Sequence, residues 1–220
     1  MTIERSIPGF LPSTAGFHFV NRWPSAPTLR FAVRVPGPVP FELELRIGDA
    51  ANGLCGGMAL VTRDRWSRGE PPPPDREPPA ESSALFREIV SRQIDSLELG
   101  VTVVRFYRAG AASDRSRARI AVRETWPAIR REIDAGRPAA LGLVHVASAD
   151  PRRLTANHQV LAYGYALDAP AGRVSLRIYD PNHPDDDTIR LAIGLDATRT
   201  RASFGYVAGD GPVIGIVRQR

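Results

Sequence analysis

The stretch Gly53-Leu-Cys-Gly-Gly-Met-Ala-Leu-Val-Thr-Arg-Asp-Arg-Trp66 gives the clearest indication of the fold of this chain. Five of its residues follow the i, i+3, i+4, i+7, i+11 spacing of one helical face: Cys55, Met58, Ala59, Thr62 and Trp66. This spacing predicts a largely buried helix that begins near Cys55. A helix start stabilises a thiolate, because its first N–H groups lack partners and the macrodipole is positive there. Gly53, Gly56 and Gly57 would allow a tight turn and let a substrate backbone approach the sulfur.

These features predict a reactive cysteine. The alternative interpretation is that Cys55 is a small buried hydrophobic residue on an apolar helix, which is how many free cysteines behave. With one cysteine the chain cannot form an internal disulfide, which suits a reducing compartment.

The sequence around this helix predicts an α+β fold. Residues 81–98 should form a second helix, capped by Ser82 or Ser83, and a third should run from about 114 or 126 to 135. After Pro138 the pattern changes to strands, expected at 140–146, 158–165, 174–179, 188–193 and 213–217. Helices that precede an antiparallel sheet favour α+β over an alternating βαβ arrangement.

The length of 220 residues favours one domain over 1–220. Residues 1–48 are rich in proline and form a β-rich lead-in, with strands expected at 31–35 and 41–45 around a Pro-Gly-Pro turn. The proline-rich stretch 69–80 can enter neither a helix interior nor a sheet ladder, so it is predicted to be an extended surface loop.

Composition excludes several classes of function. All 29 basic residues are arginine, which excludes Schiff-base lysine chemistry and a phosphate-loop lysine. The arginines are scattered, so the net charge of +5 does not predict a nucleic-acid partner. No apolar run reaches the 18 to 20 residues of a membrane-spanning helix, and the N-terminus lacks a signal-peptide pattern. We expect no membrane association, and a cytoplasmic location or export without a signal peptide.

His158 is the predicted partner of the cysteine. On its expected strand it shares a face with Val160, Ala162 and Gly164. These small side chains would let a helix pack close enough for the imidazole to reach a sulfur. The alternative is a core histidine bonded to the backbone.

Asp180 ends the apolar row Val174, Leu176 and Ile178, so its carboxylate should lie at the rim of the core. There it would orient the imidazole, as the third member of a catalytic triad does, or else only cap the Asp-Pro-Asn-His-Pro turn. The oxygen-rich stretch 180–187 lacks the EF-hand pattern, so no metal is predicted. His18 and His145 are expected to be structural.

Three motifs resemble those of the papain-like cysteine peptidase superfamily: Gly-Leu-Cys-Gly-Gly-Met at 53–58, Asn-His-Gln-Val-Leu-Ala-Tyr-Gly-Tyr at 157–165 and Ile-Tyr-Asp-Pro-Asn at 178–182. They look most similar to bacterial bacteriocin-processing peptidase domains. The resemblance covers about residues 50–67 and 138–184, and it implies a central cysteine-bearing helix packed against an antiparallel sheet.

The resemblance also implies the roles of residues: Cys55 as nucleophile, His158 as general base and acid, and Asp180 as the orienting group, with Asn182 as a second candidate for that last role. It implies a peptide or protein substrate, and no cofactor.

One departure from the family pattern concerns the oxyanion. Papain-like enzymes usually carry a glutamine five or six residues before the cysteine, where this chain has Asp49 and Ala50. Asn52, together with the backbone N–H of Cys55, is the candidate replacement. We therefore expect a thiol-dependent hydrolase or a related acyl transferase, with a catalytically inactive papain-like binding module as the alternative.

Overall fold

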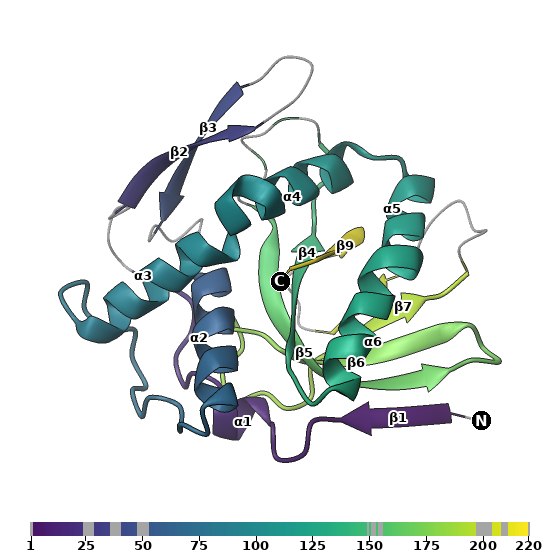
Figure 1. The fold of residues 1–220 in the computed structure, drawn as a ribbon, viewed down its shortest axis with the longest axis horizontal. Coiled ribbons are helices and arrows are strands. Elements are labelled where there is room, and N and C mark those ends of the chain that lie inside the picture. The colour runs from purple at the N-terminus through teal and green to yellow at the C-terminus, as the bar shows by residue number, and fades with distance from the viewer. Residues whose placement is uncertain are drawn as a thin grey trace.

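The computed structural model describes residues 2–23, 29–35, 41–47, 53–148, 150, 153, 156–196, 204–207 and 211–219. In chain order the elements are β1 (Thr2–Ser6), α1 (Pro12–Ala15), β2 (Leu29–Val35), β3 (Phe41–Ile47), α2 (Cys55–Ser67), α3 (Ala84–Ser96), η1 (Glu98–Gly100), α4 (Val101–Ala111), α5 (Asp114–Ile120), η2 (Ala121–Thr125), α6 (Trp126–Asp134), β4 (Ala139–Val144), β5 (His158–Asp168), β6 (Arg173–Tyr179), β7 (Arg190–Gly194), β8 (Phe204–Tyr206) and β9 (Gly215–Arg218). Most helices precede the strands of one antiparallel sheet (Figure 1), so the predicted α+β class is confirmed.

The long strand β5 lies at the centre of the main sheet, whose order is β8-β7-β6-β5-β4-β9. One edge of β5 pairs with β6. Along the other edge, β4 pairs with residues 158–162 and β1 pairs with residues 164–168. The N-terminal strand β1, which the sequence pattern did not predict, is thus held at the centre of the sheet.

The two faces of this sheet bury different helices. Ala140 of β4 and Leu161 of β5 pack with Ala59 and Leu60 of α2, while alternate residues of the same strands pack with α6. Figure 1 shows α2 on one side of β4 and β5 and α6 on the other. The helix α4 lies on the α2 face, where Phe106 fills the space that the missing side chain of Gly142 leaves.

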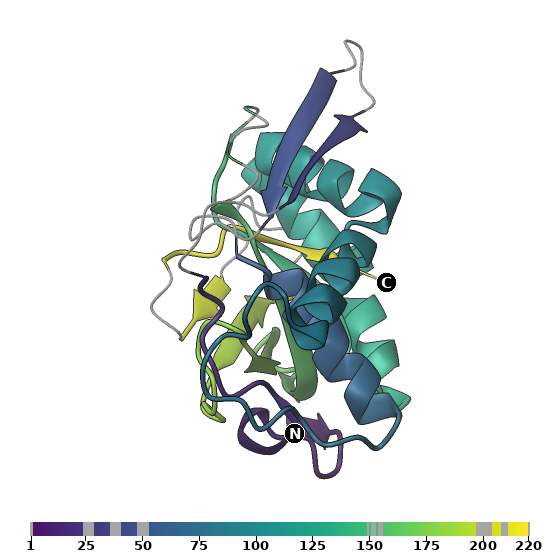
Figure 2. The same ribbon diagram turned by 90° about the vertical axis from the view of Figure 1, so that its left-hand side faces the viewer.

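The predicted helices at 81–98 and 114–135 are present with nearly the expected bounds, the second of them divided by the π-helical turn η2. The strands β2 and β3 form a separate pair in which Phe31 lies opposite Leu45 and Val33 opposite Leu43. Figure 2 shows this pair extending beyond the helices at one end of the molecule. Described residues 70–80 have neither helix nor strand, and the Trp23 indole donates a hydrogen bond to Pro79 O at 3.2 Å.

Glycines on α2 bring this helix close to its neighbours. A Cβ at Gly57 would lie 2.1 Å from the backbone oxygen of Ile89 in α3, and a Cβ at Gly56 would lie 2.3 Å from Gln159 Oε1 in β5. The space beside both glycines is therefore filled by the protein, and the expectation that it admits a substrate backbone is wrong for Gly56 and Gly57.

We expect Gly57→Ala to destabilise the fold by about 1–3 kcal/mol or more, because the added methyl group meets backbone atoms that cannot rotate away. Urea unfolding measures this change. Gly205→Ala is the matched control, since a Cβ there meets Ala192 at an ordinary 3.6 Å, and it should alter stability by no more than about 0.5 kcal/mol. Equal effects of the two variants would contradict the close α2–α3 packing.

Candidate active site

Cys55 is the first residue of α2, as the sequence predicts. The turn before it passes through Gly53, whose φ of +48° lies in the left-handed region that favours glycine. Cys55 is a free thiol with 6% of its surface exposed. The cysteine therefore lies just below the surface at the start of a helix.

His158 and Asp180 form a buried pair at neighbouring strand ends. His158 Nε2 lies 2.6 Å from Asp180 Oδ1, His158 is 7% exposed, and Asp180 is completely buried. The pairing of Leu161 with Tyr179, continued by one residue, sets Asp180 beside Val160 on the face that His158 shares. The structure thus brings these two predicted residues into direct contact.

Cys55 lies close enough to His158 for its charge and hydrogen bonding to raise the pKa of the imidazole. Because Nε2 of the ring faces Asp180, Nδ1 is the nitrogen left for the sulfur. The structure therefore assembles Cys55, His158 and Asp180 in the order that a catalytic triad requires.

The sequence predicts that the cysteine helix packs on the face of β5 that His158 shares with small residues, and this part of the prediction is wrong. The face of Val160 and Ala162 packs toward α6, whereas α2 packs against the opposite face, at Leu161 and Tyr163. Cys55 and His158 still meet because each is the first residue of its element. The close approach of α2 comes from its own glycines, not from small residues beside His158.

The electrostatics of the pair favour an ion pair. Burial by itself lowers the pKa of His158, but the charges of Asp180 and Cys55, together with their hydrogen bonds, raise it well above its ordinary value of 6.5. Burial acts to raise the pKa of Asp180, and His158, Tyr206 and the Asn182 N–H outweigh it and lower that pKa to about 2. Both shifts favour a charged imidazolium beside a charged carboxylate.

Tyr206 of β8 is a member of the site that the sequence analysis missed. Its hydroxyl donates a hydrogen bond to Asp180 Oδ2, while Asp180 Oδ1 accepts the Asn182 N–H at 2.8 Å. Both carboxylate oxygens of Asp180 are thus bonded, which fixes the orientation of the group that holds His158.

Asn182, the second candidate for the orienting role, does not take it. Its side-chain oxygen accepts a hydrogen bond from Asn21 Nδ2 at 3.1 Å, and Asp180 is the residue that contacts His158. The physical reason is the turn after β6, which directs the backbone N–H of Asn182, and not its side chain, toward the Asp180 carboxylate. The other predicted residue, the oxyanion candidate Asn52, lies outside the described residues.

Asn21 connects the cysteine loop to the turn after β6. Its Oδ1 accepts the Leu54 N–H at 2.6 Å, and its own N–H donates to Pro181 O at 3.0 Å. Hydrogen bonds therefore run from Leu54 through Asn21, Asn182 and Asp180 to His158, and His158 lies close to Cys55, the residue after Leu54. This closed circuit holds the sulfur at a fixed place relative to the imidazole.

We expect Asn21→Ala to slow alkylation of Cys55 and to cost about 1–3 kcal/mol of stability, because the Leu54 N–H loses its acceptor. Ser113→Ala is the control, since it removes the cap of α5 at a cost of about 1 kcal/mol and lies outside the circuit. Iodoacetamide kinetics and urea unfolding measure the two effects. If both variants slow alkylation equally, Asn21 has no specific role in positioning the sulfur.

Gln159 has an unusual position next to the site. Its Oε1 atom is buried beside Gly56, and among the described residues it has no hydrogen-bond partner. The neighbouring Gln93 is satisfied, since its Oε1 accepts the Gly57 N–H at 2.8 Å. The α2 start is therefore enclosed by two buried glutamines.

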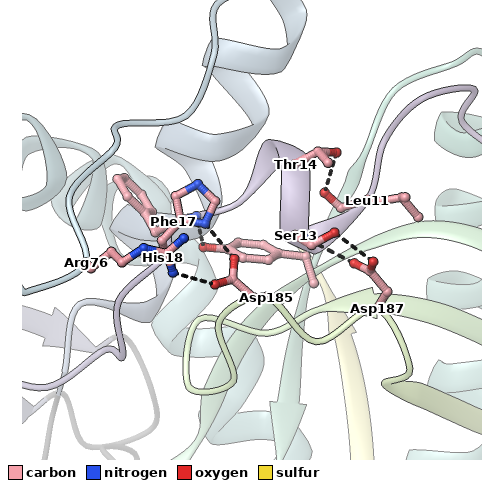
Figure 3. Close-up of polar contacts among 9 residues, drawn as sticks. Leu11, Ser13, Thr14, Phe17, His18, Arg76, Asp185 and Asp187 are labelled. Carbon is pink, nitrogen blue, oxygen red and sulfur yellow. Dashed lines mark hydrogen bonds and ion pairs between the residues drawn. The ribbon is translucent and has the colours of Figure 1, made fainter.

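The oxygen-rich turn after Asp180 is used within the protein. Asp185 Oδ1 lies 2.5 Å from His18 Nδ1, and Asp187 Oδ2 accepts the Ser13 hydroxyl at 2.7 Å (Figure 3). These contacts attach the N-terminal segment to the turn that follows Asp180. In the part of the chain that the structure describes, no group of three or more His, Cys, Asp or Glu side chains is placed to hold a metal ion.

Comparisons with protein-family models, with curated proteins and with solved structures find no match to this chain. A separate search of the described residues finds no helix long and apolar enough to cross a membrane.

Proposed function

We propose that this chain is a thiol-dependent hydrolase of papain-like architecture, either a cysteine peptidase or a related acyl transferase. The observation that carries the proposal is the buried His158–Asp180 pair, with Cys55 close enough to act on the imidazole. The same three residues occupy the motifs that resemble the papain-like superfamily.

In this proposal the resting site is a thiolate beside an imidazolium, the thiol proton having passed to His158. The Cys55 sulfur attacks a substrate carbonyl carbon, and the carbonyl electron pair moves to its oxygen. When the C–N bond breaks, His158 gives its proton to the leaving amine and a thioester remains. His158 then takes a proton from water, and the resulting hydroxide attacks the thioester carbonyl. The acid and the Cys55 thiolate are released, which restores the thiolate beside the imidazolium. If an amine attacks in place of water, the same steps give acyl transfer.

The developing oxyanion needs hydrogen-bond donors near the sulfur. The N–H groups of Cys55 and Gly56 lie in the first turn of α2, where no acceptor exists within the helix. The Leu54 N–H is already bonded to Asn21 and the Gly57 N–H to Gln93, so they are engaged elsewhere. The backbone of Cys55 is therefore the proposed first donor.

Alkylation of the single cysteine tests the proposal directly, because no other thiol reacts. At pH 7 we expect iodoacetamide to label Cys55 on the order of tenfold faster than free cysteine, of which only a few per cent is thiolate. Cys55→Ser gives the unlabelled background. Release of new amines from a mixed peptide pool, absent in Cys55→Ser, then tests hydrolysis.

Labelling of Cys55 at the rate of free cysteine, together with no cleavage of the peptide pool, would overturn the hydrolase proposal. That outcome would favour an inactive binding module that keeps the fold without the chemistry.

A further inference from the structure

A pocket of about 470 Å³ lies away from Cys55, where β4 begins and β9 ends between α2 and α6. Its volume falls in the range of small-molecule sites, which is roughly 300–1,000 Å³. Arg63 comes from α2, Arg131 and Glu132 come from α6, and Arg137 follows that helix. Ser67 of α2, Arg218 of β9 and Gln219 also contribute to the polar lining.

The charge of this lining is unbalanced. Four guanidinium groups line the pocket, and Glu132 is the one carboxylate that lines it among the described residues. Glu132 is already engaged, since its Oε2 lies 2.8 Å from Arg137 Nε. Several like charges around a concavity focus a positive potential inside it, which attracts anions.

The side chain of Arg63 is 24% exposed, which is less than the exposure of the Arg131 and Arg137 side chains. Its Nε lies 3.9 Å from Asp64 Oδ1, beyond hydrogen-bond distance, and the other oxygen of Asp64 lies 2.5 Å from Arg92. Burial lowers the pKa of Arg63, the charge of Asp64 opposes this, and Arg92 lowers the pKa further. The carboxylate nearest to Arg63 is therefore shared with Arg92 and lies closer to Arg92.

Gln219 adds an unsatisfied donor. Its Nε2 atom is buried and has no hydrogen-bond partner among the described residues, although the residue lines the pocket. Its backbone N–H bonds to Ala140 O at 3.2 Å, which holds the residue at the start of β4. A buried donor without a partner costs free energy that a bound acceptor would recover.

We propose that this pocket binds a small phosphorylated molecule with at least two negative charges. Guanidinium forks pair with two oxygens each, and a diphosphoryl group carries enough oxygens for several of them and for the Gln219 amide. The proposal does not depend on the chemistry of Cys55.

Calorimetric titration with sodium pyrophosphate tests the proposal, against sodium chloride at equal ionic strength. We expect one saturable site that Arg63→Gln weakens about tenfold or more, because a charged hydrogen bond is lost. Gln219→Met should weaken it a few-fold without any change of net charge. If Arg63→Gln does not fold, Arg137→Gln replaces it, because that side chain is 56% exposed.

The control is Arg115→Gln, which removes an exposed arginine outside the pocket and should leave affinity within about twofold. Three outcomes would overturn the proposal: no saturable binding, tighter binding of citrate than of pyrophosphate, or equal losses in Arg115→Gln and Arg63→Gln. The second outcome would mean that the pocket prefers a carboxylate ligand. The third would mean that binding depends only on the net charge of the protein.

Discussion

His158→Ala should slow the alkylation of Cys55 and any peptide cleavage by about 10²- to 10⁴-fold at pH 7, the usual contribution of a positioned general base. The imidazole contacts Asp180 and lies close to Cys55, so its loss removes the proton acceptor and the charge beside the sulfur. Stopped-flow alkylation measures the first effect, and amine release measures the second.

His145→Ala is the matched control, because the His145 ring bonds to Pro212 O at 3.2 Å and lies outside the circuit. It should leave the alkylation rate within about twofold. Alkylation of His158→Ala at the wild-type rate would leave Cys55 without an activating base and would refute the proposed mechanism.

Asp180 gives the second large effect. Asp180→Ala should cost about 3–5 kcal/mol of stability, because it leaves the charge of His158 buried without its partner. Asp180→Asn is the milder variant, since its amide oxygen still accepts from His158 and from the Asn182 N–H, and the Tyr206 hydroxyl has only to rotate. We expect Asp180→Asn to fold. This variant removes the charge of the side chain and keeps its shape, so it tests the effect of the charge alone.

The pH dependence of stability should be weaker in Asp180→Asn than in the wild type. In the wild type the pKa of folded His158 lies above 6.5, so its contribution is present below pH 6.5 and is lost as pH rises through the raised value. In Asp180→Asn burial still lowers the pKa of His158, and the largest influence that raises it, the charge of Asp180, is gone, so the contribution lost above pH 6.5 should be smaller.

Urea unfolding across pH 5 to 9 measures this difference. Tyr206→Phe is the companion variant: it removes one bond to Asp180 but keeps the carboxylate charge, so its pH profile should stay close to that of wild type. Identical profiles for wild type and Asp180→Asn would contradict the ion pair.

Sequence patterns predicted the elements that carry the proposed triad. Period-two alternation set His158 and Asp180 on one face of adjacent strands, and the register of β5 and β6 agrees with it. Helical spacing likewise identified α2 and its start at Cys55. These signals are local, so they survive in a single sequence.

The parts that the sequence pattern missed depend on distant contacts. The helix α4 contains Val101, Val103 and Val104, which favour strands, and it is held as a helix by packing of Phe106 over Gly142. Asn21 and Tyr206 reach the site from opposite ends of the chain, and neither lies in a motif that predicts chemistry. A polar residue in a weakly patterned segment gives no sign of which loop it will meet.

The circuit around Cys55 has a consequence for synthesis of the protein on the ribosome. Its members run from Asn21 to Asn182, and the Asp180 carboxylate acquires the further hydrogen bond from Tyr206 only after β8 has emerged. A nascent chain that already contains the cysteine helix still lacks the histidine and the aspartate. Translation therefore delays activation of the thiol until the strands that carry His158 and Asp180 have been made.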